Sequence, residues 1–211
     1  MKNKTLEMKM FESGFSICYL IFVYYAAYFF YSRKDLAAAL MCLLLGVGDS
    51  FHLIPRIRIN LKGPGKHDNY HLGMGNLISS VTMTLFYLLL FQVMSVRNPE
   101  QKAPHFLYLV LLALTSVRLI LCTFPQNDWL KKYEKDNSWH IIRNVPFVII
   151  GLITIYYLIA YYRQYLMAFL VFASFLCYMI VVLFASKKKA LGMFMIPKTI
   201  CYIWMIILLM K

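Results

Sequence analysis

The chain alternates long apolar runs with short polar or charged breaks, and seven of the runs are long enough to be membrane spans. A bilayer core of roughly 30 Å requires about 20 mostly apolar residues in one helix. The breaks carry charge or turn chemistry, as at Ser-Arg-Lys-Asp (32–35) and Gly-Pro-Gly (63–65). The pattern predicts an all-α, polytopic membrane helix bundle of about seven transmembrane helices, at 14–31, 36–55, 72–94, 106–124, 140–161, 165–184 and 191–210.

The composition agrees with this pattern. Hydrophobic residues make up 61% of the 211 residues and charged residues 15%, and the mean hydropathy is +0.64. Soluble domains have a smaller apolar share and a larger charged share, so a water-soluble fold would leave much of this surface exposed. No linker, repeat or low-complexity tail divides the chain, and we therefore predict a single transmembrane domain over residues 1–211.

The basic residues are distributed unevenly between the two sides of the predicted bundle. The chain has 22 Lys and Arg against 9 Asp and Glu; 13 of the basic residues fall on the side of the N-terminus and 6 on the other. Such a bias places the N-terminus in the cytoplasm. The basic charge is then explained by orientation and by contact with anionic membrane lipid, so nucleic acid is not an expected partner.

Strongly polar residues also occur inside the predicted spans. An ionisable residue at a helix centre costs about 2.5–3.5 kcal/mol on insertion scales, so it indicates a functional site by default. With the N-terminus inside, nearly all of these residues fall in the cytoplasmic half, which predicts a polar pocket open to the cytoplasm. The candidates are Asp49, His52, Asn76, Ser80, Arg118, Arg143, Asn144 and Lys198.

Their charges predict the kind of ligand and the roles of the residues. The cations outnumber the acid Asp49, which favours a phosphate or carboxylate group on a lipid or a small molecule. Asp49 and His52, three residues apart on one helix, form a candidate catalytic acid/base pair, and the other six candidates are predicted to bind substrate. The alternative is structural: Arg and Lys near an interface extend to the headgroups, and Asp49 pairs with a cation to join two helices.

Metal chemistry is less well supported. Asp49, His52 and His140 are chemically able to hold zinc, but nothing in their spacing demands it. A serine triad from Asp49, Ser50 and His52 is excluded, because Ser50 points about 100° away from Asp49 on a helix. We assign no metal ligand and no cofactor.

The segment LGVGDSFHLIPR (45–56) resembles the Gly-Asp-x-x-x-Leu-x-Pro-Arg stretch of some members of the bacterial lysoplasmalogenase-like (YhhN) family. Those are small polytopic proteins of similar length, and the family contains enzymes that hydrolyse the vinyl ether bond of lysoplasmalogens. The resemblance implies that Asp49 matches the family's first acidic motif position. The family is usually drawn with eight spans, and its early Lys-Pro element has no counterpart here.

Seven spans with intramembrane Ser, Asp and His are also similar to the superfamily of alkaline ceramidases and adiponectin-receptor-like hydrolases. Its zinc-binding late HxxxH is absent, since no histidine follows His140. The expected function is hydrolysis of a lysophospholipid or lysoplasmalogen in a bacterial cell membrane. The alternatives are a carrier or sensor of an anionic solute or lipid that performs no reaction, and a zinc-dependent ceramidase-like hydrolase.

Overall fold

The computed structural model describes residues 2–101, 103–130, 139–184 and 194–211, and all regular elements within them are helical. The first four helices are α1 (Lys2–Ser32), α2 (Leu36–Lys62), α3 (Asp68–Arg97) and α4 (His105–Thr123). A 3-10 turn (Pro125–Asn127) and the short α5 (Trp139–Ile142) follow, and then come α6 (Val145–Ala160), α7 (Tyr165–Phe184) and α8 (Met195–Met210). The predicted all-α fold is confirmed for the described residues.

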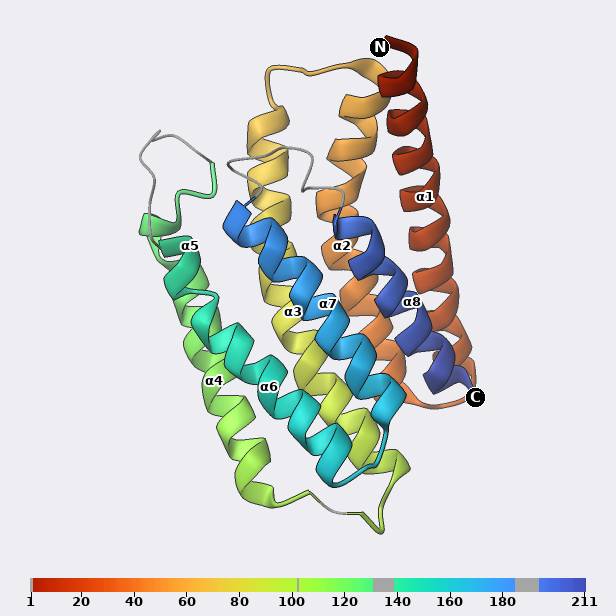
Figure 1. Ribbon diagram of the computed structural model, residues 1–211, viewed down its shortest axis with the longest axis vertical. Coiled ribbons are helices and arrows are strands. Elements are labelled where there is room, and N and C mark those ends of the chain that lie inside the picture. Colours follow the sequence, from red (N-terminus) through yellow and green to blue (C-terminus); the bar gives the residue numbers. More distant parts are fainter. Residues whose placement is uncertain (1, 102, 131–138, 185–193) are drawn as a thin grey trace.

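The seven long helices form a closed bundle (Figure 1). In order around it, α1 packs on α2, α2 on α3, α3 on α4, α4 on α6, α6 on α7 and α7 on α8, and α8 returns to α1. The N-terminus and the α2–α3 loop lie at one end, and the α1–α2, α3–α4 and α6–α7 turns lie at the other with the C-terminus. The basic residues predicted at 131–135 and 187–189 lie outside the described residues.

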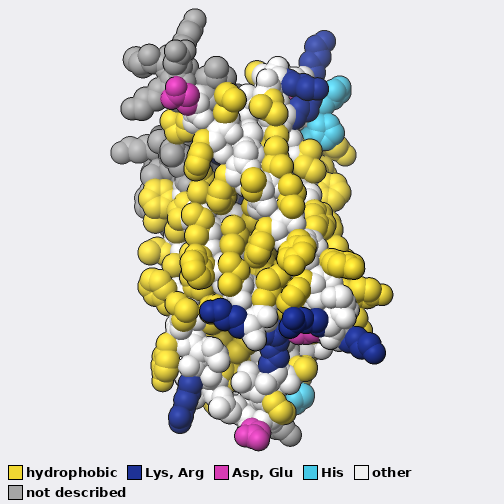
Figure 2. Space-filling model, turned by 90° about the vertical axis from the view of Figure 1, so that its right-hand side faces the viewer, with side chains coloured by type: hydrophobic (Ala, Val, Ile, Leu, Met, Phe, Trp, Pro, Cys, Tyr) yellow, Lys and Arg dark blue, Asp and Glu magenta, His cyan; other side chains and the backbone are white. Residues whose placement is uncertain are grey.

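Helices α1 to α4 are each long and apolar enough to cross a membrane. Helices α6 and α8 are apolar but have 16 residues each, which corresponds to about 24 Å of helix. Large apolar side chains remain exposed along the outside of the bundle. Figure 2 shows them covering the middle of one face, with Lys and Arg gathered toward its two ends. Such a surface is compatible with a membrane helix bundle.

Several predicted boundaries differ from the structure: α1, for example, begins at Lys2 and not at residue 14. The span expected at 140–161 is divided, because α5 ends at Ile142 and α6 begins at Val145 with Pro146 in its first turn. A proline disfavours helical geometry in the residue before it, and it suits the start of a helix. The span expected to end at Pro55 instead continues as α2 to Lys62. Helices in membranes tolerate such a proline where neighbouring groups compensate for the lost hydrogen bond.

Glycines allow α2 and α3 to approach closely. A Cβ added to Gly48 would collide with the side chain of Thr82, and one added to Gly75 would collide with the backbone carbonyl of Phe51. Small residues at such contacts bring helix backbones together in membrane proteins. The close contact fixes the position of the polar residues beside them, Asp49 on α2 and Asn76 on α3.

Candidate functional site

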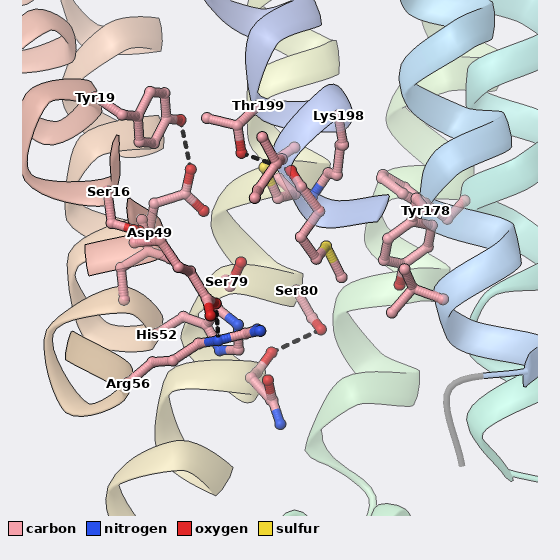
Figure 3. Close-up of a pocket in the computed structure, with 18 of the residues that line it drawn as sticks. Ser16, Tyr19, Asp49, His52, Arg56, Ser79, Ser80, Tyr178, Lys198 and Thr199 are labelled. Atoms are coloured by element: carbon pink, nitrogen blue, oxygen red, sulfur yellow. Dashed lines mark hydrogen bonds and ion pairs between the residues drawn. The ribbon is translucent and has the colours of Figure 1, made fainter. Parts of the chain in front are cut away.

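A cavity of about 240 Å³ lies in the half of the bundle that holds the N-terminus. All seven long helices contribute to its wall, and Figure 3 shows side chains from several of them turned toward one another. Seven of the eight residues predicted from the sequence line it: Asp49, His52, Asn76, Ser80, Arg118, Arg143 and Lys198. Asn144 is buried outside the wall and accepts a hydrogen bond from the Tyr178 hydroxyl at 2.9 Å.

Arg118 of α4 has the most unusual environment of these residues. Its side chain is 1% exposed, and its guanidinium carbon lies 3.6 Å from the centre of the Phe147 ring. Its Nε and Nη1 have no hydrogen-bond partner among the described residues. The aromatic face supplies a cation–π contact but no acceptor for these N–H groups. The buried charge is therefore incompletely compensated by the described protein groups.

Arg143 lies between α5 and α6 and has a similar setting. Its guanidinium carbon is 3.9 Å from the centre of the Trp129 ring, and its Nη1 donates to Asn127 Oδ1 at 3.0 Å. Its Nε has no hydrogen-bond partner within the described part of the chain. Gly73 of α3 leaves room for the backbone carbonyl of Trp129, with which any Cβ at that position would collide. A glycine thus positions the indole ring on which Arg143 stacks.

Lys198 of α8 brings a third cation to the cavity. Its side chain is buried, and its Nζ lies 5.3 Å from the ring centres of both Tyr178 and Tyr202. No described carboxylate forms an ion pair with Arg118, Arg143 or Lys198. These cations therefore face the cavity with aromatic rings as their close neighbours.

The acidic side of the cavity is formed by α1 and α2. Asp49 accepts a hydrogen bond from the Tyr19 hydroxyl at 2.5 Å, and the two side chains point toward each other in Figure 3. About two helical turns from Tyr19, Glu12 forms an ion pair with Arg56 of α2. Arg56 is therefore in direct contact with a protein counter-charge, whereas no described carboxylate forms an ion pair with the three cations on the other side.

His52 lies between these acids and the helix α3. Its Nδ1 is buried and has no hydrogen-bond partner among the described residues. The Ser80 hydroxyl donates to the Asn76 carbonyl of its own helix at 2.8 Å, so Ser80 is not held by His52. The described contacts thus leave one polar atom of His52 free to meet a ligand or water, and they show no serine–histidine pair.

The sequence interpretation missed several wall residues. Glu12, Ser16 and Tyr19 are spaced i, i+4 and i+7, so they form a polar stripe on one face of α1 that could have been recognised. Trp129 carries no such signal, because it follows a 3-10 turn and reaches the cavity through contacts that depend on the tertiary fold.

No protein-family model, curated protein or solved structure matches this chain. The described residues contain no group of three or more His, Cys, Asp or Glu side chains that could hold a metal ion. His140, named above with Asp49 and His52 as a conceivable zinc set, has a side chain outside the described part of the structure. The site is therefore interpreted from its own geometry.

Proposed function

We propose that this chain is a multi-pass membrane protein that binds an anionic group of a lipid or a small molecule in the cavity. The observation that carries the proposal is Arg118, a fully buried cavity-wall residue whose Nε and Nη1 have no hydrogen-bond partner among the described residues. A buried charge is costly unless it is paired, and an anion in the cavity would supply the missing acceptors. The orientation that we predict from loop charges opens this half of the bundle to the cytoplasm.

Trp129 gives a direct assay, because its ring lies beneath Arg143 in the cavity wall. The chain has three tryptophans, and a W139F/W204F background leaves this one as the fluorophore. Purified protein in neutral detergent would be titrated with inorganic phosphate and glycerol 3-phosphate, and with glycerol and choline as neutral and cationic controls. We expect saturable fluorescence changes with the two anions alone. No change with either anion would refute the proposal.

Arg118→Gln tests the residue itself. Hydrogen bonds to charged groups contribute about 1.5–3 kcal/mol, so we expect the affinity for glycerol 3-phosphate to fall about tenfold to hundredfold. The ligand-free variant should unfold at nearly the same temperature, since loss of the Phe147 contact is offset by removal of a poorly compensated charge. Arg33→Gln is the matched control, because Arg33 is exposed at the other end of the bundle. Unchanged affinity in Arg118→Gln would contradict the assigned role.

A second function, hydrolysis of a lysophospholipid or lysoplasmalogen, is favoured by His52. Its Nδ1 has no hydrogen-bond partner among the described residues, and His52 lines the same cavity as Asp49, where an acid/base group would meet a bound ether or ester. Release of the aldehyde or fatty acid from labelled lysolipids by purified protein would be measured, with Asp49→Asn and His52→Gln as variants. Turnover lost in both variants would support an enzyme. Anion binding that persists in both variants without any wild-type turnover would support a carrier or sensor.

A further inference from the structure

The charges around the cavity allow the ligand class to be narrowed, on the basis of the proposed anion binding. The described residues of the wall include four cations and two acids: Arg56, Arg118, Arg143 and Lys198, against Glu12 and Asp49. The wall thus carries two more positive than negative side chains, so two positive charges remain without an acidic counter-charge among these residues.

Two of the cations have an acidic counter-charge in the cavity wall. Arg56 is in direct ion-pair contact with Glu12, which also accepts from Asn60 Nδ2 at 3.4 Å. Lys198 and Asp49 form no ion pair, but both line the cavity, and their opposite charges attract each other there. Asp49 is further satisfied by the Tyr19 hydroxyl. The acidic side of the wall therefore accounts for two cations and has no acid left for the others.

The remaining cations are Arg118 and Arg143. Each guanidinium stacks on an aromatic ring, and each retains at least one N–H group without a partner among the described residues. The two guanidiniums line the same cavity, and their like charges repel each other. A single ligand that offers two negative charges and several acceptor oxygens would neutralise both and remove this repulsion.

We propose that the cavity recognises the dianionic end of a phosphate monoester. Near neutral pH such a group carries a charge of about −1.5 to −2 and has three terminal oxygens. The guanidinium fork matches the spacing of phosphate oxygens. A phosphodiester or a carboxylate brings one negative charge, which would leave one arginine uncompensated in the wall.

The size of the cavity agrees with a small headgroup. Its volume of about 240 Å³ is below the range of about 300–1,000 Å³ that is usual for sites of drug-sized ligands. A terminal phosphate with a short glycerol-like stem is of suitable size, and a diester with a second bulky substituent is not. The same phosphate chemistry occurs in a single-chain lipid and in a small soluble metabolite.

The soluble form of the test uses methyl phosphate and dimethyl phosphate at pH 7.5, with Trp129 fluorescence as the readout. The two probes differ by one methyl group and by about one negative charge. We expect wild-type protein to bind the monoester about tenfold or more tightly than the diester, given the strength of charge-assisted hydrogen bonds. This preference should shrink to about threefold or less in Arg118→Gln and in Arg143→Gln, and persist in Arg33→Gln.

The lipid form of the test compares lysophosphatidic acid with lysophosphatidylglycerol of the same acyl chain, in neutral detergent micelles. A monoester preference that is accompanied by much tighter binding of the lipid than of methyl phosphate would identify a lipid ligand. The same preference without a gain from the acyl chain would identify a soluble one. Equal affinity for monoester and diester in both forms of the test would overturn the inference, while anion binding itself would still stand. Failure of every anion to bind would instead remove the proposed function.

Discussion

The contact between α2 and α3 provides a sharp test of the structure, because Gly75 has no room for a side chain. An added Cβ would overlap the carbonyl oxygen of Phe51 and would lie 2.8 Å from its carbonyl carbon and 2.9 Å from the Cα of His52. All three are backbone atoms, so no rotation of a side chain can relieve the overlap. Gly75→Ala must therefore move the two helices apart by several tenths of an ångström.

The size of the effect follows from two opposing contributions. Overpacking of a tight contact costs about 1–3 kcal/mol. Alanine in place of glycine inside a helix recovers about 0.5–1 kcal/mol. Because the overlap at Gly75 is with backbone, the cost belongs in the upper part of its range, and the net loss of stability should be about 1–2 kcal/mol. For a chain of this size, that corresponds to a melting temperature about 2–8 °C lower.

Gly14→Ala is the matched control, since no atom lies within 4 Å of a Cβ added there. Thermal unfolding of both variants in the same detergent would be followed by circular dichroism, and phosphate binding by Trp129 fluorescence. We expect Gly14→Ala to match or exceed the wild type in stability. Gly75→Ala should be less stable and should bind phosphate more weakly, because its neighbours Asn76 and His52 line the cavity. Equal stability of the two variants would refute the close α2–α3 packing.

Two further substitutions test polar contacts away from the cavity wall. Tyr87→Phe removes a buried hydroxyl that lies 3.2 Å from the hydroxyls of both Ser174 and Tyr202, so these two buried groups lose a hydrogen-bond partner. Thermal unfolding should therefore show a loss of stability of about 1–2 kcal/mol. Arg97→Gln removes the ion pair with Asp35 and the hydrogen bond to the Leu209 carbonyl, and it should cost about 1 kcal/mol, since the pair is partly exposed. The role given to the Tyr87 hydroxyl would be contradicted if Tyr87→Phe were as stable as the wild type. The role given to Arg97 would be contradicted if Arg97→Gln lost phosphate binding without losing stability.

Much of the fold could be predicted because membrane spans are encoded locally. A span is identified by the length of its own apolar run and by the polar residues that end the run. The charge at Ser-Arg-Lys-Asp (32–35), for example, marks a boundary without reference to the rest of the chain. The break before α6 was missed because Arg143 and Asn144, which occupy it, were interpreted as polar residues inside a continuous span. Pro146, which suits the first turn of a helix, was the local signal for a new start there.

The membership of the site could be predicted better than its contacts. Depth within a span follows from position along the chain, so residues such as Asp49 and Arg118 could be placed in the same half of the bundle before their neighbours were known. Their partners depend on helix rotation and on which helices are adjacent. The Tyr19–Asp49 hydrogen bond joins residues 30 positions apart, and its formation requires α1 and α2 to face each other in one register. Hydrophobic patterns do not specify that register.

Three arginines show why charge alone does not identify the site. Arg97 is paired with Asp35, and Arg56 is paired with Glu12, so each is explained by stability within the protein. Arg118 is more deeply buried than either, yet its described neighbours offer an aromatic face and no carboxylate. A structural role alone would favour an apolar residue of similar volume at this position, since that substitution is often neutral or stabilising for a buried charge. An anion bound in the cavity would compensate this charge, so the proposed function accounts for the burial of Arg118.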